Sequence, residues 1–88
     1  MLKPDYTSKF KKDYKRAMNR NLDISLIDAV MYDLINEIPL SVKHMDHALS
    51  GDYIGCRECH VKPNWLLIYQ VGNGIIVFER TGTHSDLF

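Results

Sequence analysis

The apolar residues of this chain change their spacing once, near the middle of the sequence. In residues 8–20 they recur at helical spacing while lysines and arginines occupy the opposite face, and Ser8 is a candidate N-cap. A second stripe at helical spacing begins after Asp23 and ends before Pro39. Residues 39–52 show neither helical nor strand spacing, so we expect an exposed loop. The first half of the chain therefore predicts two amphipathic helices.

The second half of the chain has the composition of β-strands. Residues 53–61, 65–71 and 75–82 are rich in aromatic and β-branched side chains, and the turn Gly72-Asn73-Gly74 joins the last two. Residues 2–6 are a candidate edge strand, because their proline cannot donate to a central ladder. The sequence thus predicts an α+β fold in which two N-terminal helices pack on a twisted antiparallel sheet of three to five strands.

The size and charge of the chain limit the number of its domains and the kinds of partner that it attracts. A chain of 88 residues buries only about 60% of the surface that it exposes when unfolded, so we expect one domain over residues 1–88. Eleven basic and eleven acidic residues balance, which gives no general attraction to nucleic acid or to an anionic membrane. The N-terminus has no apolar signal segment and no stretch is long enough to span a bilayer, so we expect a cytoplasmic protein with reduced cysteines.

The segment from Cys56 to His60 reads CRECH, a spacing found in haem attachment and in half of a zinc site. If the segment is a strand, Cys56 and Cys59 point to opposite faces of the sheet and cannot share a metal. A zinc site that adds His44 and His47 to the cysteines would need a tight knuckle instead, and haem would need an export signal. The other interpretation is that both cysteines fill space as small apolar residues.

Three histidines lie at the ends of the predicted strands. His47 falls in the loop, His60 near a strand end and His84 in the C-terminal tail, and an antiparallel sheet could bring them together. Strand alternation also places Cys56 and Glu58 on the face of His60. Imidazoles titrate near neutral pH, which suits the proton transfers of RNA cleavage through the ribose 2′-hydroxyl. A lone strand histidine is more often a hydrogen-bonded structural residue, so the chemistry depends on the three meeting.

Three segments of the second half, DHALSG, CRECHVKPNWLLIY and FERTGTHSDLF, resemble the YafQ toxins, a branch of the RelE/ParE superfamily of bacterial type II toxins. The similarity is dense over residues 46–88, and the helical first half agrees in layout. The resemblance implies a RelE-like fold and a ribosome-dependent endoribonuclease that cuts messenger RNA in the A site of the 70S ribosome and so inhibits translation. It also implies a bacterial cytoplasmic protein without metal or cofactor, held inactive by a DinJ-like antitoxin in a complex such as a heterotetramer.

The resemblance assigns active-site roles to three histidines. His47, His60 and His84 match the catalytic positions of the family. As a hypothesis, His47 is the general base and His84 the general acid, or the reverse, while His60 binds the scissile phosphate or orients a partner. Family members usually carry aspartate where this chain has Asn64, and an amide accepts a hydrogen bond but carries no charge. We therefore expect the rate or the pH optimum to differ.

Other residues are expected to support catalysis or to bind RNA. Arg80 either stabilises the charge on the pentacoordinate phosphorus or forms an ion pair with Glu79 or Glu58. Trp65 and Phe88 match aromatic positions of the family and are candidates to stack on bases, although Trp65 also fits the core. Five basic residues of the first helix are either solvated surface or contacts to ribosomal RNA: Lys9, Lys11, Lys12, Lys15 and Arg16.

Two other interpretations stay open. One is a catalytically weakened module of the same fold that binds only its antitoxin or RNA, and Asn64 is the feature that favours it. The other is a small zinc-binding protein. His44 matches no active-site position of the family, and we assign it to the loop surface.

Overall fold

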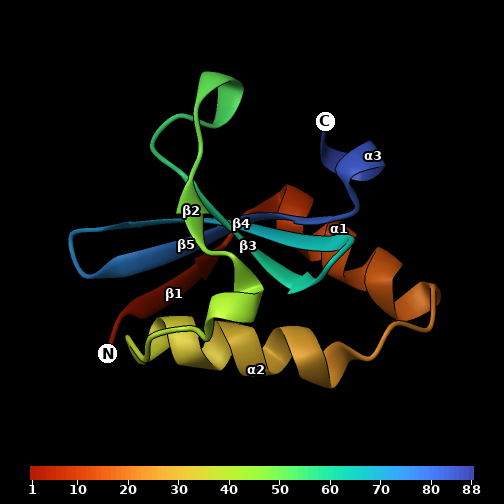
Figure 1. Ribbon diagram of the computed structural model, residues 1–88, viewed down its shortest axis with the longest axis horizontal. Helices are drawn as coiled ribbons and strands as arrows, with labels where there is room; N and C mark the ends of the chain where they lie inside the picture. Colours follow the sequence, from red (N-terminus) through yellow and green to blue (C-terminus); the bar gives the residue numbers. More distant parts are fainter.

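The computed structural model describes residues 1–88, which form two long helices, one sheet and a short C-terminal helix (Figure 1). In chain order the elements are β1 (Lys3–Tyr6), α1 (Ser8–Asn19), α2 (Ile24–Ile35), the 3₁₀ turn η1 (Val42–His44), β2 (His47–Ala48), the 3₁₀ turn η2 (Gly51–Tyr53), β3 (Arg57–Lys62), β4 (Trp65–Gly72), β5 (Ile75–Gly82) and α3 (His84–Leu87). None of the helices combines the length and the apolar composition that a membrane crossing requires.

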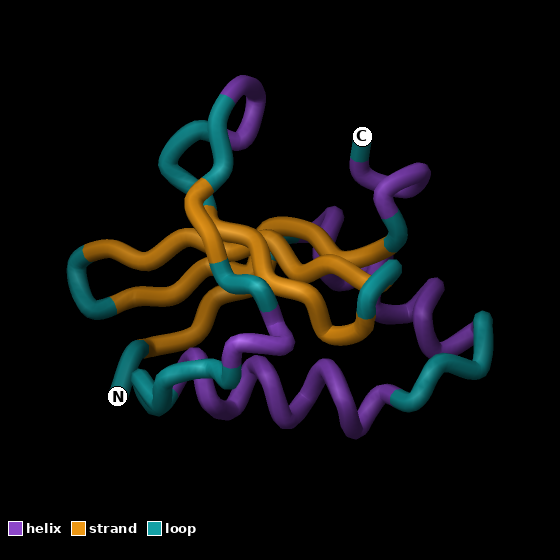
Figure 2. The backbone as a smooth tube through the Cα atoms, viewed as in Figure 1, coloured by secondary structure: helices purple, strands orange, loops and turns teal.

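The five strands form one sheet in the order β1-β5-β4-β3-β2. The strands from β2 to β5 are antiparallel neighbours, whereas β1 lies parallel to β5. Helices α1 and α2 pack on one side of this sheet, and Figure 2 shows the segment around η2 and helix α3 rising from it on the other. The predicted α+β fold is confirmed. The sheet is mixed because no hairpin turn links β1 to β5, so nothing forces these two strands to be antiparallel.

The two long helices begin at hydrogen-bonding caps. Thr7 caps α1, since its Oγ1 accepts a hydrogen bond from the backbone N–H of Phe10 at 2.9 Å and its backbone is extended. Ser8, which the sequence predicts as the cap, already lies in the helix. That prediction is wrong by one position because adjacent hydroxyl residues can both cap, and only the backbone conformation distinguishes them. Asp23 caps α2 by accepting a hydrogen bond from the N–H of Ser25.

Strand β3 is shorter than the sequence predicts. It begins at Arg57 instead of residue 53, because residues 51–53 form η2. Gly55 has a φ of 90°, which an extended strand does not allow. The composition of this segment suits a strand, but its glycines direct the chain into a turn.

The region between α2 and β3 contains structure where the sequence predicts only a loop. Within residues 39–52, the two residues of β2 pair with β3 and place His47 opposite Glu58. The glycine-rich turn between β4 and β5 is as predicted: Asn73 and Gly74 have φ values of 53° and 76°, as a two-residue type I′ hairpin turn requires. The pairing of β2 with β3 is the step that positions the first histidine.

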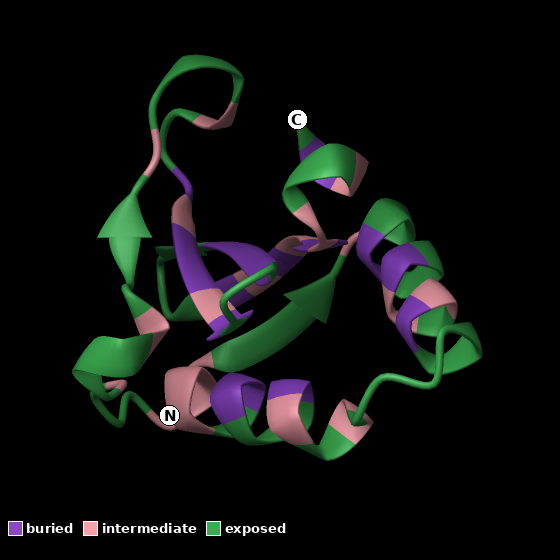
Figure 3. Ribbon diagram, turned by 45° about the vertical axis from the view of Figure 1, so that its right-hand side comes forward, coloured by how far each residue is buried: buried purple, intermediate pink, exposed green.

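Apolar side chains are buried on both faces of the sheet. Figure 3 shows buried residues along the strands and on the two long helices. The larger cluster lies between the sheet and the two long helices and includes Cys59, Trp65, Leu67 and Phe78. The smaller cluster lies on the opposite face and consists of Cys56, Leu66, Ile68 and Leu87. The smaller cluster joins α3 to the sheet through Leu87.

The outer edge of β1 offers few hydrogen-bond donors. The N–H groups of Lys3 and Thr7 bond to carbonyl oxygens on the side of β5, at 2.9 and 3.2 Å. Of the alternate residues, Pro4 has no N–H, and the N–H of Tyr6 donates to the side chain of Asp5 at 2.9 Å. At the free edge of β1, one position therefore has no N–H and the next has an N–H that is already hydrogen-bonded.

Candidate active site

Three histidines from distant parts of the chain meet on the sheet face opposite α1 and α2. His47 lies on β2, His60 on β3 and His84 is the first residue of α3. The ring centroids of His47 and His60 are 6.4 Å apart, and those of His60 and His84 are 6.3 Å apart. The structure thus brings together the three histidines that the sequence analysis selected.

A buried carboxylate lies between two of these rings. Oε2 of Glu58 is 3.2 Å from Nε2 of His47 and 3.9 Å from Nε2 of His60. The side chain is only 6% exposed, and its Oε1 has no hydrogen-bond partner within the protein. The sequence analysis considered Glu58 only as a partner for Arg80, although strand alternation already placed it on the face of His60. The carboxylate therefore carries one buried oxygen that no donor of the protein satisfies.

Backbone carbonyls fix the orientation of two histidine rings. Nδ1 of His47 lies 2.6 Å from the carbonyl oxygen of Met45, and Nδ1 of His60 lies 3.2 Å from that of Pro63. Since a carbonyl only accepts, both Nδ1 atoms carry hydrogen, and both Nε2 atoms face Glu58.

The chain entering β2 is anchored to the core ahead of His47. The Tyr69 hydroxyl donates to Oδ1 of Asp46 at 2.6 Å, and Nε of Arg57 donates to the same oxygen at 3.3 Å. Burial and the neighbouring Asp46 carboxylate raise the pKa of Tyr69. The phenol therefore stays a hydrogen-bond donor to Asp46. This anchored aspartate holds the next residue, His47, in place.

His44 is not a simple surface residue, which corrects the sequence-based assignment. Its ring is half-buried, and its Nδ1 lies 2.7 Å from the backbone carbonyl oxygen of His60. This carbonyl lies where a bulge disturbs the pairing between β3 and β4. The imidazole therefore satisfies a backbone carbonyl beside an irregularity of the sheet, an arrangement that no local pattern in the sequence indicates.

The C-terminal residues form a helix that the sequence analysis missed. Thr83 and Asp86 form a capping box, in which each side chain accepts a hydrogen bond from the backbone N–H of the other. His84 is exposed, and its ring centroid is 6.1 Å from that of Phe88. Phe88 is 64% exposed and meets Tyr53 edge to face at 5.6 Å. The last aromatic ring is therefore accessible to a base.

Two neighbouring residues at the turn between β3 and β4 differ in their exposure to solvent. Asn64 is exposed, and its amide makes no hydrogen bond within the protein. Trp65 is only 4% exposed, and its indole N–H donates to the hydroxyl of Thr81 at 3.0 Å. The structure thus supports core packing for Trp65, and this burial contradicts the prediction that it stacks on RNA bases.

Arg80 forms an ion pair, but with neither glutamate that the sequence suggests. Its Nε donates to Asp13 of α1 at 2.7 Å and its Nη2 at 3.2 Å. Asp13 also accepts from the guanidinium of Arg16 at 2.8 Å and from the backbone N–H of Thr81 at 3.2 Å, and it is 5% exposed. The hydrogen bond to Asp13 raises the pKa of Arg80, which is permanently charged. This partner lies 67 residues away, so the sequence pattern did not indicate it.

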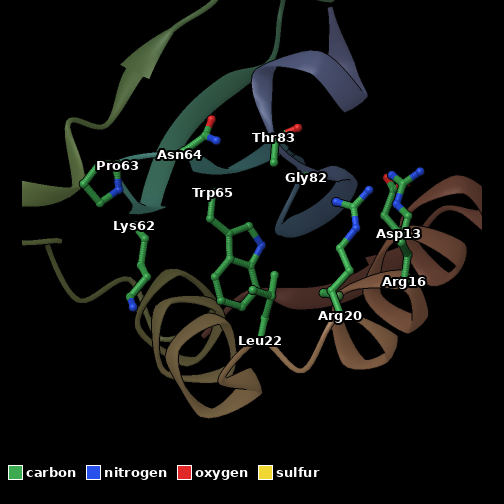
Figure 4. Close-up of a pocket in the computed structure, with 11 residues that line it drawn as sticks. Asp13, Arg16, Arg20, Leu22, Lys62, Pro63, Asn64, Trp65, Gly82 and Thr83 are labelled. Atoms are coloured by element: carbon green, nitrogen blue, oxygen red, sulfur yellow. The ribbon is translucent and has the colours of Figure 1, made fainter.

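The basic residues of α1 lie on the side of the sheet away from the histidines. The four lysines Lys9, Lys11, Lys12 and Lys15 are exposed, whereas Arg16 is half-buried beside Asp13. Near the end of α1, a pocket of about 370 Å³ is lined by side chains that include Arg16, Arg20, Lys62, Asn64 and Trp65 (Figure 4). Arg16 pairs with Asp13 and Arg20 with Asp86, so Lys62 is the lining cation that has no acidic partner.

The two cysteines do not form a metal site. Cys56 and Cys59 belong to apolar clusters on opposite faces of the sheet, as strand alternation predicts. No group of three or more histidine, cysteine, aspartate or glutamate side chains has an arrangement suited to hold an ion. The geometry therefore favours the space-filling interpretation of the cysteines over the zinc-binding one.

We expect both thiols to be unreactive in the folded protein. Burial, followed by the nearby Asp46 and Glu58, raises the pKa of Cys59 to about 12, and burial also raises the pKa of Cys56. A neutral buried thiol contributes stability below the pKa of an unfolded thiol, about 8.5, and this contribution is lost as the pH rises toward about 12. At pH about 8, a disulfide reagent should modify the native protein at least about 100-fold more slowly than the urea-unfolded protein. Equal rates would show that the thiols are accessible.

Comparisons with known proteins show which family this chain resembles in sequence and in fold. A family described as bacterial toxin of type II toxin-antitoxin system, YafQ, matches residues 2–88. The chain is 41% identical to the mRNA interferase toxin YafQ of Escherichia coli strain K12 over 85 residues, 96% of this chain and 92% of that protein. The crystal structure of the E. coli DinJ-YafQ complex matches with a TM-score of 0.93 and 39% identity, covering 100% of this chain and 99% of the other. A metal-bound toxin from Helicobacter pylori also matches, with a TM-score of 0.93, 39% identity and complete coverage of both chains, at 100% each.

Proposed function

This chain belongs to the YafQ family of bacterial toxins of type II toxin-antitoxin systems, and we propose that it is an endoribonuclease that cuts messenger RNA in the ribosomal A site. The family assignment confirms the resemblance carried by the three sequence motifs. The observation that supports cleavage is the meeting of His47, His60 and His84 beside the carboxylate of Glu58, with successive ring centroids 6.4 and 6.3 Å apart. These groups provide both a proton acceptor and a proton donor near one linkage.

The reaction is an in-line attack by the ribose 2′-oxygen on the adjacent phosphorus. The 2′-oxygen forms a bond to phosphorus, the bond to the 5′-oxygen breaks, and a cyclic or 3′-phosphate end remains. Nε2 of His47 takes the 2′-proton, because its Nδ1 is already bound to a carbonyl, and Glu58 at 3.2 Å stabilises the resulting imidazolium. His84 donates a proton to the departing 5′-oxygen, and the two roles could be exchanged between His47 and His84.

The remaining residues bind the substrate or orient these groups. His60 lies between the other two rings and binds the scissile phosphate or orients a partner. Phe88 stacks on an exposed base, a contact worth about 1–3 kcal/mol in single-stranded recognition. Asn64 accepts or donates a hydrogen bond at the rim, where an aspartate would add charge. Arg80 stays paired with Asp13, and it is from that position that it stabilises the negative charge developing on the phosphoryl group.

Binding to the ribosome and to the antitoxin uses surfaces beyond the histidines. The exposed lysines of α1 (Lys9, Lys11, Lys12 and Lys15), with Arg16 beside them, contact phosphates of ribosomal RNA, so binding falls as the salt concentration rises. E. coli YafQ has been solved in complex with DinJ, and a DinJ-like antitoxin holds this chain inactive. The reaction proceeds without metal, because each proton transfer has an imidazole within reach, although a toxin from H. pylori has been solved with bound metal.

A second candidate function is a binding module of the same fold with weakened catalysis. The observation that favours it is Asn64, an exposed and unbonded amide where the sequence motif of the family usually carries a carboxylate. Such a module would bind antitoxin and ribosome without cutting messenger RNA. The two functions therefore differ in one measurable product, the cleaved RNA end.

Mapping of RNA ends on ribosomes programmed with a defined messenger RNA tests the proposal. We expect the purified protein to produce ends confined to the A-site codon, with a rate that varies between pH about 5 and 8, where imidazoles titrate. No new ends at any pH in this range would support the binding module instead. Treatment with a chelator that removes transition metals but leaves Mg²⁺ should not change the rate, and loss of cleavage would contradict metal independence.

A further inference from the structure

An ion pair with two contacts joins the end of α1 to the helix that carries His84. The Nη1 atom of Arg20 lies 2.8 Å from Oδ2 of Asp86, and its Nη2 lies 3.2 Å from Oδ1. Figure 4 shows the Arg20 side chain extending from α1 toward Gly82 and Thr83, where α3 begins. This contact, the Arg20–Asp86 bridge, links two residues that are 66 positions apart in the sequence.

The carboxylate of the bridge also caps α3. Oδ2 of Asp86 accepts a hydrogen bond from the backbone N–H of Thr83 at 2.9 Å, and the Asp86 side chain is 13% exposed. The hydrogen bond from Arg20, followed by the one from Thr83, holds the pKa of Asp86 well below its usual range. Asp86 therefore stays charged at every pH at which an imidazole changes its protonation state.

Helix α3 depends on such attachments because it is only four residues long. A single helical turn is unstable by itself in water. Within α3, only the side chain of Leu87 is buried, and the ring of His84 is exposed without a hydrogen bond. The chain also passes very close to Asp86 at Gly82, where an added Cβ would lie 2.9 Å from the Asp86 side chain. The position of His84 therefore depends on Leu87 below the helix and on Asp86 at its side.

We propose that Arg20 and Asp86 are positioning residues, which hold α3 so that the imidazole of His84 faces His60 and the scissile linkage. This proposal rests on the proposed nuclease function. Arg20 could otherwise be read as a contact to RNA, but Asp86 occupies both of its terminal nitrogens. A guanidinium held in this way is well suited to fix geometry, since its planar fork matches both oxygens of one carboxylate.

Steady-state cleavage of ribosome-bound messenger RNA tests the bridge. We expect Arg20→Ala and Asp86→Asn each to lower kcat by about tenfold with little change in KM, because misplacement of a catalytic group by about 1 Å can cost up to about a hundredfold. The double variant should be no slower than the slower single variant, because both changes remove one shared contact. Arg20→Lys should recover only part of kcat. Lys3→Ala, which removes a positive charge on β1 without breaking an ion pair, is the matched control and should cleave normally.

Amide hydrogen exchange gives a second measurement that does not depend on cleavage. In Arg20→Ala, the exchange of the Asp86, Leu87 and Phe88 amides should rise at least about tenfold while that of the β4 amides is unchanged. Unchanged exchange in α3, or cleavage at the wild-type rate, would overturn the proposal. A higher KM that is additive with Asp86→Asn would instead assign Arg20 to RNA binding. If the unmodified protein fails to cleave, the nuclease function fails, and the exchange data still decide whether the bridge holds α3.

Discussion

Replacing His84 with glutamine is expected to slow cleavage of ribosome-bound messenger RNA by at least about a hundredfold, because general acid–base catalysis typically contributes 10²- to 10⁴-fold. Glutamine retains hydrogen-bonding atoms but has no group that gains or loses a proton near neutral pH. The ring of His84 makes no hydrogen bond within the protein, so its replacement should leave the fold intact. The rate of appearance of A-site RNA ends measures the effect, and loss of growth arrest on expression without antitoxin should accompany it.

The neighbouring residue Ser85 provides the control for this experiment. Ser85 lies in α3 and is exposed, and its hydroxyl makes no hydrogen bond within the protein, so Ser85→Ala should cleave at the wild-type rate. Both variants should melt at the temperature of the unmodified protein. If His84→Gln cleaves as fast as Ser85→Ala, His84 is not the proton donor or acceptor.

Replacing Asp13 with alanine should lower the free energy of unfolding by about 3 kcal/mol, the range observed when one partner of a buried ion pair is removed. The carboxylate is 5% exposed and accepts hydrogen bonds from Arg80, Arg16 and the backbone N–H of Thr81. Its loss leaves the buried N–H without an acceptor and both guanidinium groups without their partner. Urea denaturation followed by circular dichroism gives the free energy of unfolding directly.

Asp28 serves as the comparison, because it is an exposed aspartate with one side-chain hydrogen bond, to the Tyr14 hydroxyl at 2.6 Å. Asp28→Ala should cost less than about 1 kcal/mol. Similar losses for the two variants would mean that the contacts of Asp13 add no more than ordinary surface contacts.

The sequence pattern predicts those features that depend on neighbouring residues. The helical stripes, the alternation that separates Cys56 from Cys59, and the turn at Asn73 and Gly74 each follow from local spacing. The convergence of the histidines follows in outline from an antiparallel sheet. What fixes it in detail is β2, a strand of two residues that is too short to give a periodic signal.

The features that the sequence did not predict depend on contacts between distant segments. Asp13 meets Arg80 because α1 packs against β5, and no local spacing relates the two residues. The indole of Trp65 turns into the core because the Thr81 hydroxyl satisfies its N–H there. Glu58 lies opposite His47 through strand pairing, and His44 contacts the backbone carbonyl of His60 beside a bulge in the sheet. In each case the partner is set by tertiary packing instead of residue order.

Pro4 and the backbone N–H of Tyr6, which donates to the Asp5 side chain, restrict how this protein can assemble through β1. Another polypeptide that approached this margin in an extended conformation would find no regular row of N–H groups to bond with. Fibril growth by stacking along that margin is therefore disfavoured, even when many copies accumulate. A partner that extends the sheet must do so beside β2, at the border where His47 lies.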